Sequence, residues 1–266
     1  MTELKTSPTR FSFPRLSYRV WKVWRRNVDV FMKTIRVNFL PSLLEPILYL
    51  LALGLGLGGF VQPIEGMPYI NFIAPALVSI SIMYGSFFEC TYASFVRMYF
   101  QKTFDAIVAT PVSVEEVIAG ELLWGATRAA ANATIVLAVI AAFGLVSNPS
   151  FILVPLLSFF GGLMFASLGM CFTAIASNID FFNYPTFLLI TPMFLLSGTF
   201  FPTSSLPPPA GIAAQFLPLT HVVNLSRGLI SGTIGVPLLL SAVWIAVATP
   251  VFFILSINLM KKRLVK

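Results

Sequence analysis

Stretches of about 20 consecutive apolar residues recur along this chain, and a helix of that length crosses the hydrocarbon layer of a bilayer. Charges inside these stretches are rare. Glu45 interrupts the first, Glu89 is the one charge in the second, and Arg128 is the one charge in the third. The sequence therefore predicts an all-α membrane protein with six transmembrane helices. We expect the spans at residues 40–61, 70–95, 122–146, 151–176, 181–201 and 234–260.

The low charge content excludes a water-soluble enzyme. The chain is 57% hydrophobic and 10% charged, and its mean hydropathy is +0.88. A soluble domain carries about 25% charged residues. This sequence has too few charges to cover a water-exposed surface.

The basic residues are concentrated at the two ends of the chain. Nine of the seventeen lie within residues 1–40, and four lie in the C-terminal tail. Such clusters beside apolar spans indicate anionic lipid and membrane orientation rather than nucleic-acid binding. The 96–121 loop, with Arg97 and Lys102, falls on the same side as both termini, whereas the other side carries only Arg227. The positive-inside rule therefore predicts a multi-pass protein of the bacterial inner membrane with both termini in the cytoplasm.

Residues 17–38 combine Trp21, Trp24, Phe31 and Ile35 with many cations. This pattern predicts an amphipathic helix in the cytoplasmic interface, with the tryptophans at headgroup depth. An ordinary solvated basic stretch is the alternative. The expected division is a basic tail with an interfacial helix at residues 1–39 and a six-helix membrane domain at residues 40–266.

The loop between the second and third spans is compact and amphipathic. Thr110 and Pro111 break it, and Ser113 can cap a helix whose N-terminus Glu115 and Glu116 favour. A short cytoplasmic helix followed by a capped longer helix is therefore expected here.

The segment at residues 202–233 is expected on the periplasmic side, yet it is too apolar for a solvated loop. Its prolines prevent one continuous helix. We expect two short re-entrant half-helices that close a pore, with His221, Asn224 and Arg227 near the exit. Arg227 would meet an anionic headgroup of lipid or substrate. The alternative is that it anchors to phospholipid or caps a helix.

Glu89 and Arg128 lie at similar distances from the loop that joins their antiparallel spans, so they can share one depth and pair. A charge inside a span is costly and marks either function or a structural pair. Both a bundle-fixing ion pair and a direct substrate role remain open. Glu45 lies near the cytoplasmic end of its span and can reach the interface or the basic helix.

Soluble-enzyme motifs are missing from the sequence. Gly54, Gly56 and Gly59 match G-x-G-x-x-G, but they close a lipid-length apolar run and lack the required strand. The chain has no nucleotide-binding P-loop, and its single histidine excludes a multi-histidine metal site. Small residues instead predict close helix packing. They form two faces, Gly54 with Gly58, and Ser158 with Gly162 and Ala166.

The order of these parts resembles the permease of type-2 ABC exporters, and within that superfamily the nodulation protein J group of lipooligosaccharide exporter permeases. The stretches that carry the resemblance cover nearly the whole chain after about residue 40. The long second stretch is the most specific. The stretches that carry the resemblance are LLEPILYLLALGLGLG, FFECTYASFVRMYFQKTFDAIVATPVSVEEVIAGELLWGAT, FASLGM, ITPMFLLSGTFFP and FLPLTHVVNLSRGL.

The resemblance implies that two permease copies form the pore and that separate ATPase subunits bind beneath them. ATP and Mg²⁺ would be used by the ATPase, and this chain would bind no cofactor. Its substrate would be amphipathic, such as a lipooligosaccharide or another lipid-linked glycan. The loop at 100–117 would be the coupling helix. Its expected contact residues are Lys102, Phe104, Asp105, Ile107, Val108, Thr110 and Pro111.

Other functions remain as alternatives. A drug or antibiotic efflux permease of the same superfamily fits the sequence equally well. A membrane-embedded enzyme would need a polar catalytic cluster, for which His221 beside Arg227 is thin support. An ion channel would need rings of like charge or a polar filter, and the sequence contains neither.

Overall fold

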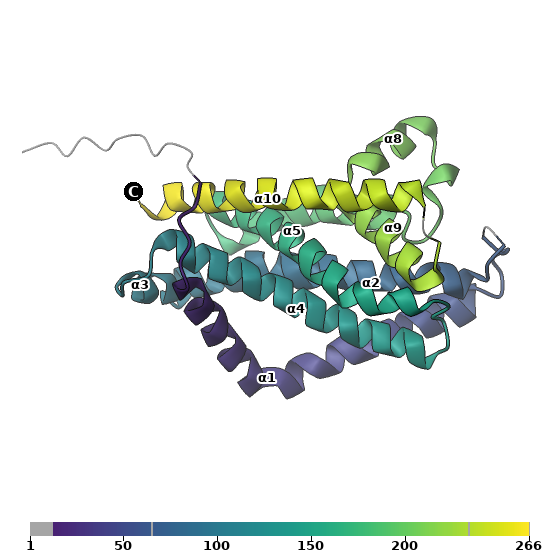
Figure 1. Cartoon of the computed structure of the whole chain (residues 1–266), viewed down its shortest axis with the longest axis horizontal. Coiled ribbons are helices and arrows are strands. Elements are labelled where there is room, and N and C mark those ends of the chain that lie inside the picture. Colours follow the sequence, from purple (N-terminus) through teal and green to yellow (C-terminus); the bar gives the residue numbers. More distant parts are fainter. Residues whose placement is uncertain (1–12, 65, 234, 266) are drawn as a thin grey trace, which may run out of the picture.

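A computed structural model describes residues 13–64, 66–233 and 235–265, and nearly all of these residues are helical. Figure 1 shows the long helices running side by side in one bundle. The α-helices are α1 (Arg19–Tyr49), α2 (Tyr69–Phe88), α3 (Thr103–Val108), α4 (Val114–Ala142), α5 (Val154–Ile175), α6 (Asn183–Pro185), α7 (Thr191–Leu196), α8 (Pro208–Phe216), α9 (Pro218–Ser231) and α10 (Val236–Leu264).

Five helical stretches within the described residues are long and apolar enough to cross a membrane, which confirms a multi-pass helical protein. The expected first span is represented by a shorter apolar helix, Leu43–Leu57, so the sixth crossing stays a prediction. The five long stretches are Tyr69–Phe100, Val114–Ala142, Pro149–Ile175, Ile179–Leu196 and Val236–Leu264.

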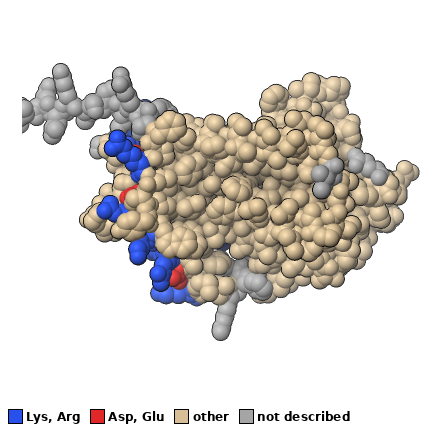
Figure 2. All heavy atoms as spheres, in the orientation of Figure 1, with Lys and Arg blue, Asp and Glu red and all other residues tan. Residues whose placement is uncertain are grey.

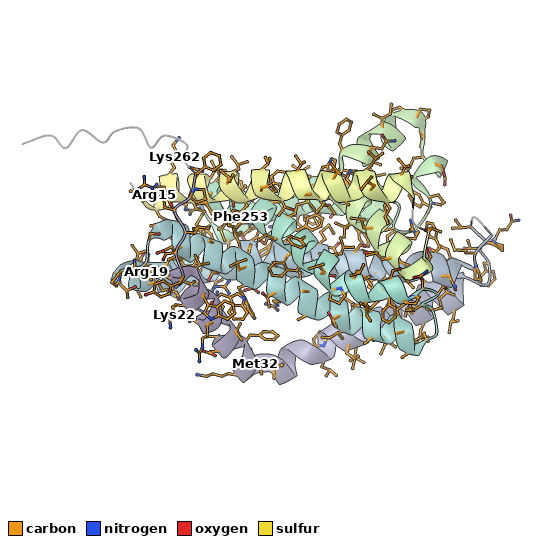
Figure 3. All side chains as sticks on the ribbon, viewed as in Figure 1. Arg15, Arg19, Lys22, Met32, Phe253 and Lys262 are labelled. Atoms are coloured by element: carbon orange, nitrogen blue, oxygen red, sulfur yellow. The ribbon has the colours of Figure 1, made fainter. Side chains whose placement is uncertain are left out.

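The expected interfacial helix and first span are one continuous helix. α1 passes directly into a π-helical stretch, Leu50–Leu57, and Figures 1 and 3 show that α1 changes direction near Met32. Its first part packs on α4, where a Cβ added to Gly120 would lie only 2.6 Å from the Cβ of Val23. The Trp24 ring nitrogen donates to Thr127 at 2.9 Å. The basic part of α1 is therefore a packed element of the bundle.

Small residues bring α4 and α5 together. A Cβ added to Gly162 would lie 2.7 Å from the Cβ of Ala129, and one added to Gly125 would lie 3.1 Å from the Cβ of Ala166. The predicted small-residue face of the fourth span is thus confirmed as a close helix contact. Gly54 likewise faces Ile70 of α2, since a Cβ there would lie 2.7 Å from the Ile70 Cγ1.

The two ends of the bundle differ in charge. Both ends of the described chain, together with α3, lie at one end, which we call the basic end (Figure 1). The lysines, arginines and acidic residues visible in Figure 2 gather there. Glu115 at the start of α4 accepts from Lys261 of α10 at 2.5 Å and from the Arg15 backbone amide at 2.6 Å. Short polar contacts at the start of α4 thus tie both ends of the chain together.

The opposite end contains the 202–233 segment, which forms the two short helices α8 and α9 that were expected (Figure 1). α9 enters the core, because Leu219, Val222 and Val223 are fully buried. α8 is more peripheral, and its Ile212 and Phe216 are exposed. Whether either helix enters a membrane from outside stays a prediction.

Candidate functional site

Four charged side chains meet between α4 and the helical stretch Tyr69–Phe100 that begins with α2, and we call them the ionic cluster: Glu89, Arg97, Glu121 and Arg128. Arg128 contacts Glu89, which confirms the pairing predicted from sequence. Arg97 bridges the two carboxylates, with 2.8 Å from its Nη1 to the Glu89 Oε1 and 2.6 Å from its Nη2 to the Glu121 Oε2. The two positive and two negative charges compensate one another inside the bundle.

Neutral donors complete the cluster. The Trp124 ring nitrogen donates to Glu89 at 2.8 Å, and the Ser94 hydroxyl donates to Glu121 at 2.8 Å. The Asn27 side-chain amide of α1 donates to the other Glu121 oxygen at 2.6 Å. Buried carboxylates are tolerated when their oxygens accept such bonds. The cluster therefore joins α1 and α4 to the helical stretch that continues from α2.

Arg97 and Glu121 were expected at the two ends of a loop at residues 96–121, and the loop is shorter than expected. Helical structure continues past α2 through Val96–Phe100, and α4 begins already at Val114. Glu89 and Arg97 are eight residues apart, and Glu121 and Arg128 are seven apart, so each pair lies on one helix face about two turns apart. This spacing was the signal that sequence reasoning missed.

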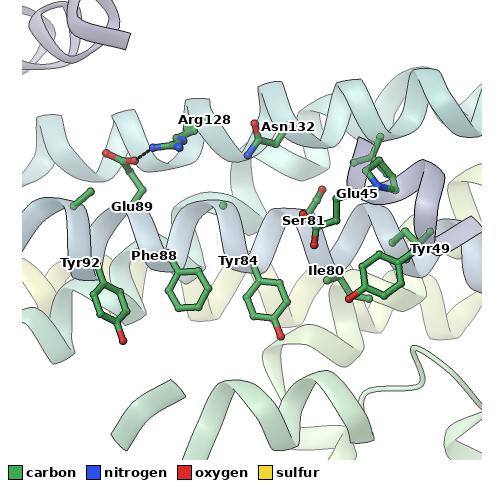
Figure 4. A pocket seen from close by; sticks show the side chains of 15 residues that line it. Glu45, Tyr49, Ile80, Ser81, Tyr84, Phe88, Glu89, Tyr92, Arg128 and Asn132 are labelled. Atoms are coloured by element: carbon green, nitrogen blue, oxygen red, sulfur yellow. Dashed lines mark hydrogen bonds and ion pairs between the residues drawn. The ribbon is translucent and has the colours of Figure 1, made fainter. Parts of the chain in front are cut away.

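A cavity of about 390 Å³, the inner cavity, lies beside the ionic cluster. Figure 4 shows Tyr84, Phe88 and Tyr92 in a row along the helical stretch Tyr69–Phe100, which begins with α2, while Glu89 and Arg128 meet between this stretch and α4. The Tyr84 and Phe88 rings stack with centroids 5.4 Å apart, and Phe88 meets Tyr92 edge-on at 5.8 Å. We call these three rings the aromatic row. All three are half-buried and line the inner cavity, and the two tyrosines add hydroxyl groups to its lining residues.

Glu45 also lines the inner cavity, together with Tyr49. Figure 4 places both near Ser81, on the far side of Tyr84 from the ionic cluster. Glu45 is exposed, and it lies on the part of α1 that follows the bend. The sequence predicted that Glu45 reaches either the membrane interface or the basic helix. The structure places it at the inner cavity.

A second cavity of about 430 Å³, the arginine chamber, adjoins the first. Arg26, Arg97 and Arg128 line it, together with Asn27, Phe31 and Gln101. The two cavities share the same wall at four positions. These are Glu89, Tyr92, Ala93 and Arg128.

The expected coupling residues form α3 and the turn after it. Lys102 adopts a left-handed conformation with φ 53° and ends the long helix, so that α3 turns back at the basic end. Phe104 is buried in the chain's own core and is not displayed for a partner. Ile107 is half-buried against the same core. The exposed members are Lys102, Asp105, Val108, Thr110 and Pro111.

The helix after this turn begins as predicted. The Ser113 hydroxyl accepts from the Glu116 amide at 3.2 Å, and the Glu116 carboxylate accepts from the Ser113 amide at 2.8 Å. This reciprocal capping box fixes the start of α4. The Arg19 guanidinium donates to the Pro111 carbonyl at 2.5 Å, which joins α1 to the α3–α4 turn.

The three expected exit residues do not form one site. Asn224 and Arg227 line a cavity of about 740 Å³ at the opposite end, together with Phe72. His221 instead stacks on Trp244 of α10 and contacts the Gln215 carbonyl at 2.9 Å. Burial lowers the pKa of His221, which favours its neutral form. His221 therefore holds α8, α9 and α10 together.

Arg227 contacts two backbone carbonyls and an aromatic ring. Its Nη2 donates to the Gly198 carbonyl at 2.9 Å and to the Phe72 carbonyl at 3.3 Å, and its guanidinium lies 3.9 Å from the centroid of the Phe72 ring.

Within the described ranges, no group of three or more His, Cys, Asp or Glu side chains is arranged to hold a metal ion.

Comparison with known proteins gives these cavities a context. Residues 18–231 match the ABC-2 type transporter family, which is most of the chain and includes both cavities. This chain belongs to the ABC-2 type transporter family. It is therefore a transport permease, and the resemblance noted from its sequence is confirmed.

Individual relatives match this chain over more than nine-tenths of their own length. The chain is 37% identical to nodulation protein J of Rhizobium leguminosarum bv. trifolii over 246 residues, which cover 92% of this chain and 93% of the relative. It is 36% identical to nodulation protein J of Rhizobium meliloti (strain 1021), covering 91% and 92% of the two chains. It is 24% identical to the inner membrane transport permease YadH of Escherichia coli (strain K12), covering 90% and 93%.

Proposed function

We propose that this chain is the membrane subunit of an ATP-driven exporter that moves an amphipathic substrate, a lipooligosaccharide or another lipid-linked glycan, across the bacterial inner membrane. The observation that carries the proposal is the aromatic row beside the inner cavity. Tyrosine rings present a flat face to sugars and hydroxyls to their polar groups, while Phe88 and the aliphatic lining accept a hydrocarbon chain. Similarity to nodulation protein J supports export of this class.

Two permease copies and separate ATPase subunits complete the proposed exporter. The ATPase binds ATP and Mg²⁺, and it contacts the exposed surface of α3 at the basic end. Lys102, Asp105 and Val108 are displayed there, and Val108 is 40% exposed despite being apolar. Both termini lie in the cytoplasm in this arrangement, because the basic residues gather at the same end.

Transport by the reconstituted permease–ATPase complex tests the substrate. Tyr84→Ala and Tyr92→Ala each remove a ring from the inner cavity. Stacking on an aromatic ring contributes about 1 kcal/mol or more per ring. We expect each variant to reduce lipooligosaccharide export about fivefold or more. Tyr184→Ala is the matched control, because Tyr184 is exposed on α6 and lines neither cavity. Unchanged export by both cavity variants, or wild-type transport of lipophilic drugs alone, contradicts the proposed substrate.

Thiol chemistry tests the partner and the orientation. A cysteine at Asp105 should crosslink to the ATPase and should resist a membrane-impermeant reagent applied to spheroplasts. A cysteine at Ser204 is the control, because that residue is exposed in the segment at the opposite end. It should show the reverse behaviour. External labelling of the cysteine at position 105 would contradict the topology.

A further inference from the structure

The arginine chamber carries an excess of positive charge. Arg26, Arg97 and Arg128 line it, whereas Glu89 is the carboxylate in its lining. Glu121 lies behind Arg97 and supplies a second negative charge. Three positive charges against two negative ones leave this set one positive charge in excess. A chamber of this kind attracts an anion, since guanidinium groups bind phosphate, sulfate and carboxylate groups through paired hydrogen bonds.

The inner cavity has the opposite balance. Its charged lining residues are Glu45, Glu89 and Arg128, so these residues together carry one negative charge in excess. Its remaining lining is dominated by the aromatic row and aliphatic side chains. An anionic group is therefore favoured in the arginine chamber, and an apolar or neutral group is favoured beside the aromatic row.

Arg128 is placed at the boundary between the two cavities and lines both. Its side chain is 29% exposed, compared with 15% for Arg97 and 1% for Glu89. Arg128 is not the sole partner of Glu89. The Glu89 Oε1 also accepts from Arg97 and from Trp124, at 2.8 Å each. If Arg128 turns toward a ligand, the charge of Glu89 stays compensated by Arg97.

We propose that the arginine chamber is the binding site for an anionic head group of the transported amphiphile. In this arrangement Arg128 exchanges the Glu89 Oε2 for a phosphate, sulfate or carboxylate oxygen of the ligand, and Arg26 supplies the second cation. The vacated Glu89 Oε2 accepts from a ligand hydroxyl. The apolar part of the amphiphile extends along the aromatic row. This inference rests on the proposed function and adds the charge of the substrate to it.

The fixed members of the ionic cluster fit this division. Arg97 contacts both carboxylates, and Glu121 is tied to Asn27 and Ser94. These residues position the wall of the chamber. Arg26 lies on the first part of α1, where its Nη1 donates to the side-chain Oδ1 of Asn27 at 3.0 Å. A ligand anion between Arg26 and Arg128 therefore connects α1 to α4 on the open side of the chamber.

Binding of dodecyl phosphate to the full chain in phosphatidylcholine nanodiscs tests the site, with dodecanol as the neutral probe. We expect Arg26→Gln to weaken dodecyl phosphate binding about tenfold or more, since a hydrogen bond to a charged group is lost, and to leave dodecanol binding unchanged. Arg25→Gln removes the same charge one residue away on the exposed surface and is the matched control. Its effect should be less than about twofold.

Arg128→Lys separates the exchange from folding, because it keeps the charge and removes the paired donors. We expect this variant to weaken dodecyl phosphate binding and to unfold close to the wild-type temperature. Inorganic phosphate should compete with dodecyl phosphate, and phosphatidylglycerol should compete if membrane lipid is the source of the anion. Equal binding of dodecyl phosphate by the wild type, Arg26→Gln and Arg128→Lys overturns the proposal. Export of an anionic glycolipid that Arg26→Gln leaves unchanged would remove the anion site while retaining the exporter.

Discussion

Arg128 and Arg227 are both partly buried arginines on helices of this bundle, but their surroundings differ. Arg128 contacts the carboxylate of Glu89 in a cluster of four charges. Arg227 contacts the Gly198 and Phe72 carbonyls and the face of the Phe72 ring. A buried carboxylate that loses its cation keeps an uncompensated charge, whereas a carbonyl or a ring that loses its cation stays neutral. Among these contacts, Arg128 compensates the charge of a carboxylate, whereas Arg227 interacts with carbonyl dipoles and a ring face.

The largest effect is expected from Arg97→Gln. Arg97 bridges Glu89 and Glu121, so its removal leaves both buried carboxylates without their shared cation. We expect a loss of about 3–5 kcal/mol in the free energy of unfolding, measured by denaturant titration in detergent micelles. Lys102→Gln is the control, because Lys102 is exposed after the same helix. A loss no greater than that of the control would show that the cluster does not stabilise the bundle.

A smaller effect is expected when Arg128 is removed, because Glu89 retains Arg97 and Trp124. Arg128→Gln should cost about 1.5–3 kcal/mol, and the double variant with Glu89→Gln should cost less than the sum of the single variants. The same unfolding measurement gives the interaction energy. Additive losses would be evidence against direct coupling of the two side chains.

Arg227→Gln tests the opposite half of the comparison. It removes a guanidinium that contacts one ring face and two carbonyls but leaves no carboxylate behind among those contacts. We expect a loss of about 1–2 kcal/mol, smaller than that of Arg97→Gln. Phe72→Leu should reproduce the ring contribution. A loss equal to that of Arg97→Gln would abolish the distinction drawn between the two halves.

The smallest effect on stability is expected from Glu45→Gln. Glu45 is exposed at the inner cavity, so its side chain is not packed into the core. The free energy of unfolding should change by less than about 0.5 kcal/mol. The same variant should strengthen binding of dodecyl phosphate if charge repulsion keeps anions out of the inner cavity. A large destabilisation would place Glu45 among the structural charges.

Much of the fold was predictable because local physics decides it. Apolar length gives the long helices, and the spacing of Ser113 and Glu116 gives the start of α4. The pairing of Glu89 with Arg128 followed from two charges at equal distances from one connecting loop. Arg97 and Glu121 were not predicted as bundle residues, because the apolar runs of the sequence end before these charges. In the structure the helices continue past the apolar runs, and the two charges compensate each other inside the bundle.

Apolar length and capping residues are properties of neighbouring positions, so the sequence by itself determined that this chain forms membrane-length helices and where α4 begins. Tertiary structure alone decided which face each helix turns inward. The four-residue spacing of Tyr84, Phe88 and Tyr92 is visible in the sequence, but only packing against α1 and α4 leaves their rings beside a cavity. Packing likewise buries Phe104 and brings Asn27 to Glu121, because contacts between distant segments depend on how the helices cross.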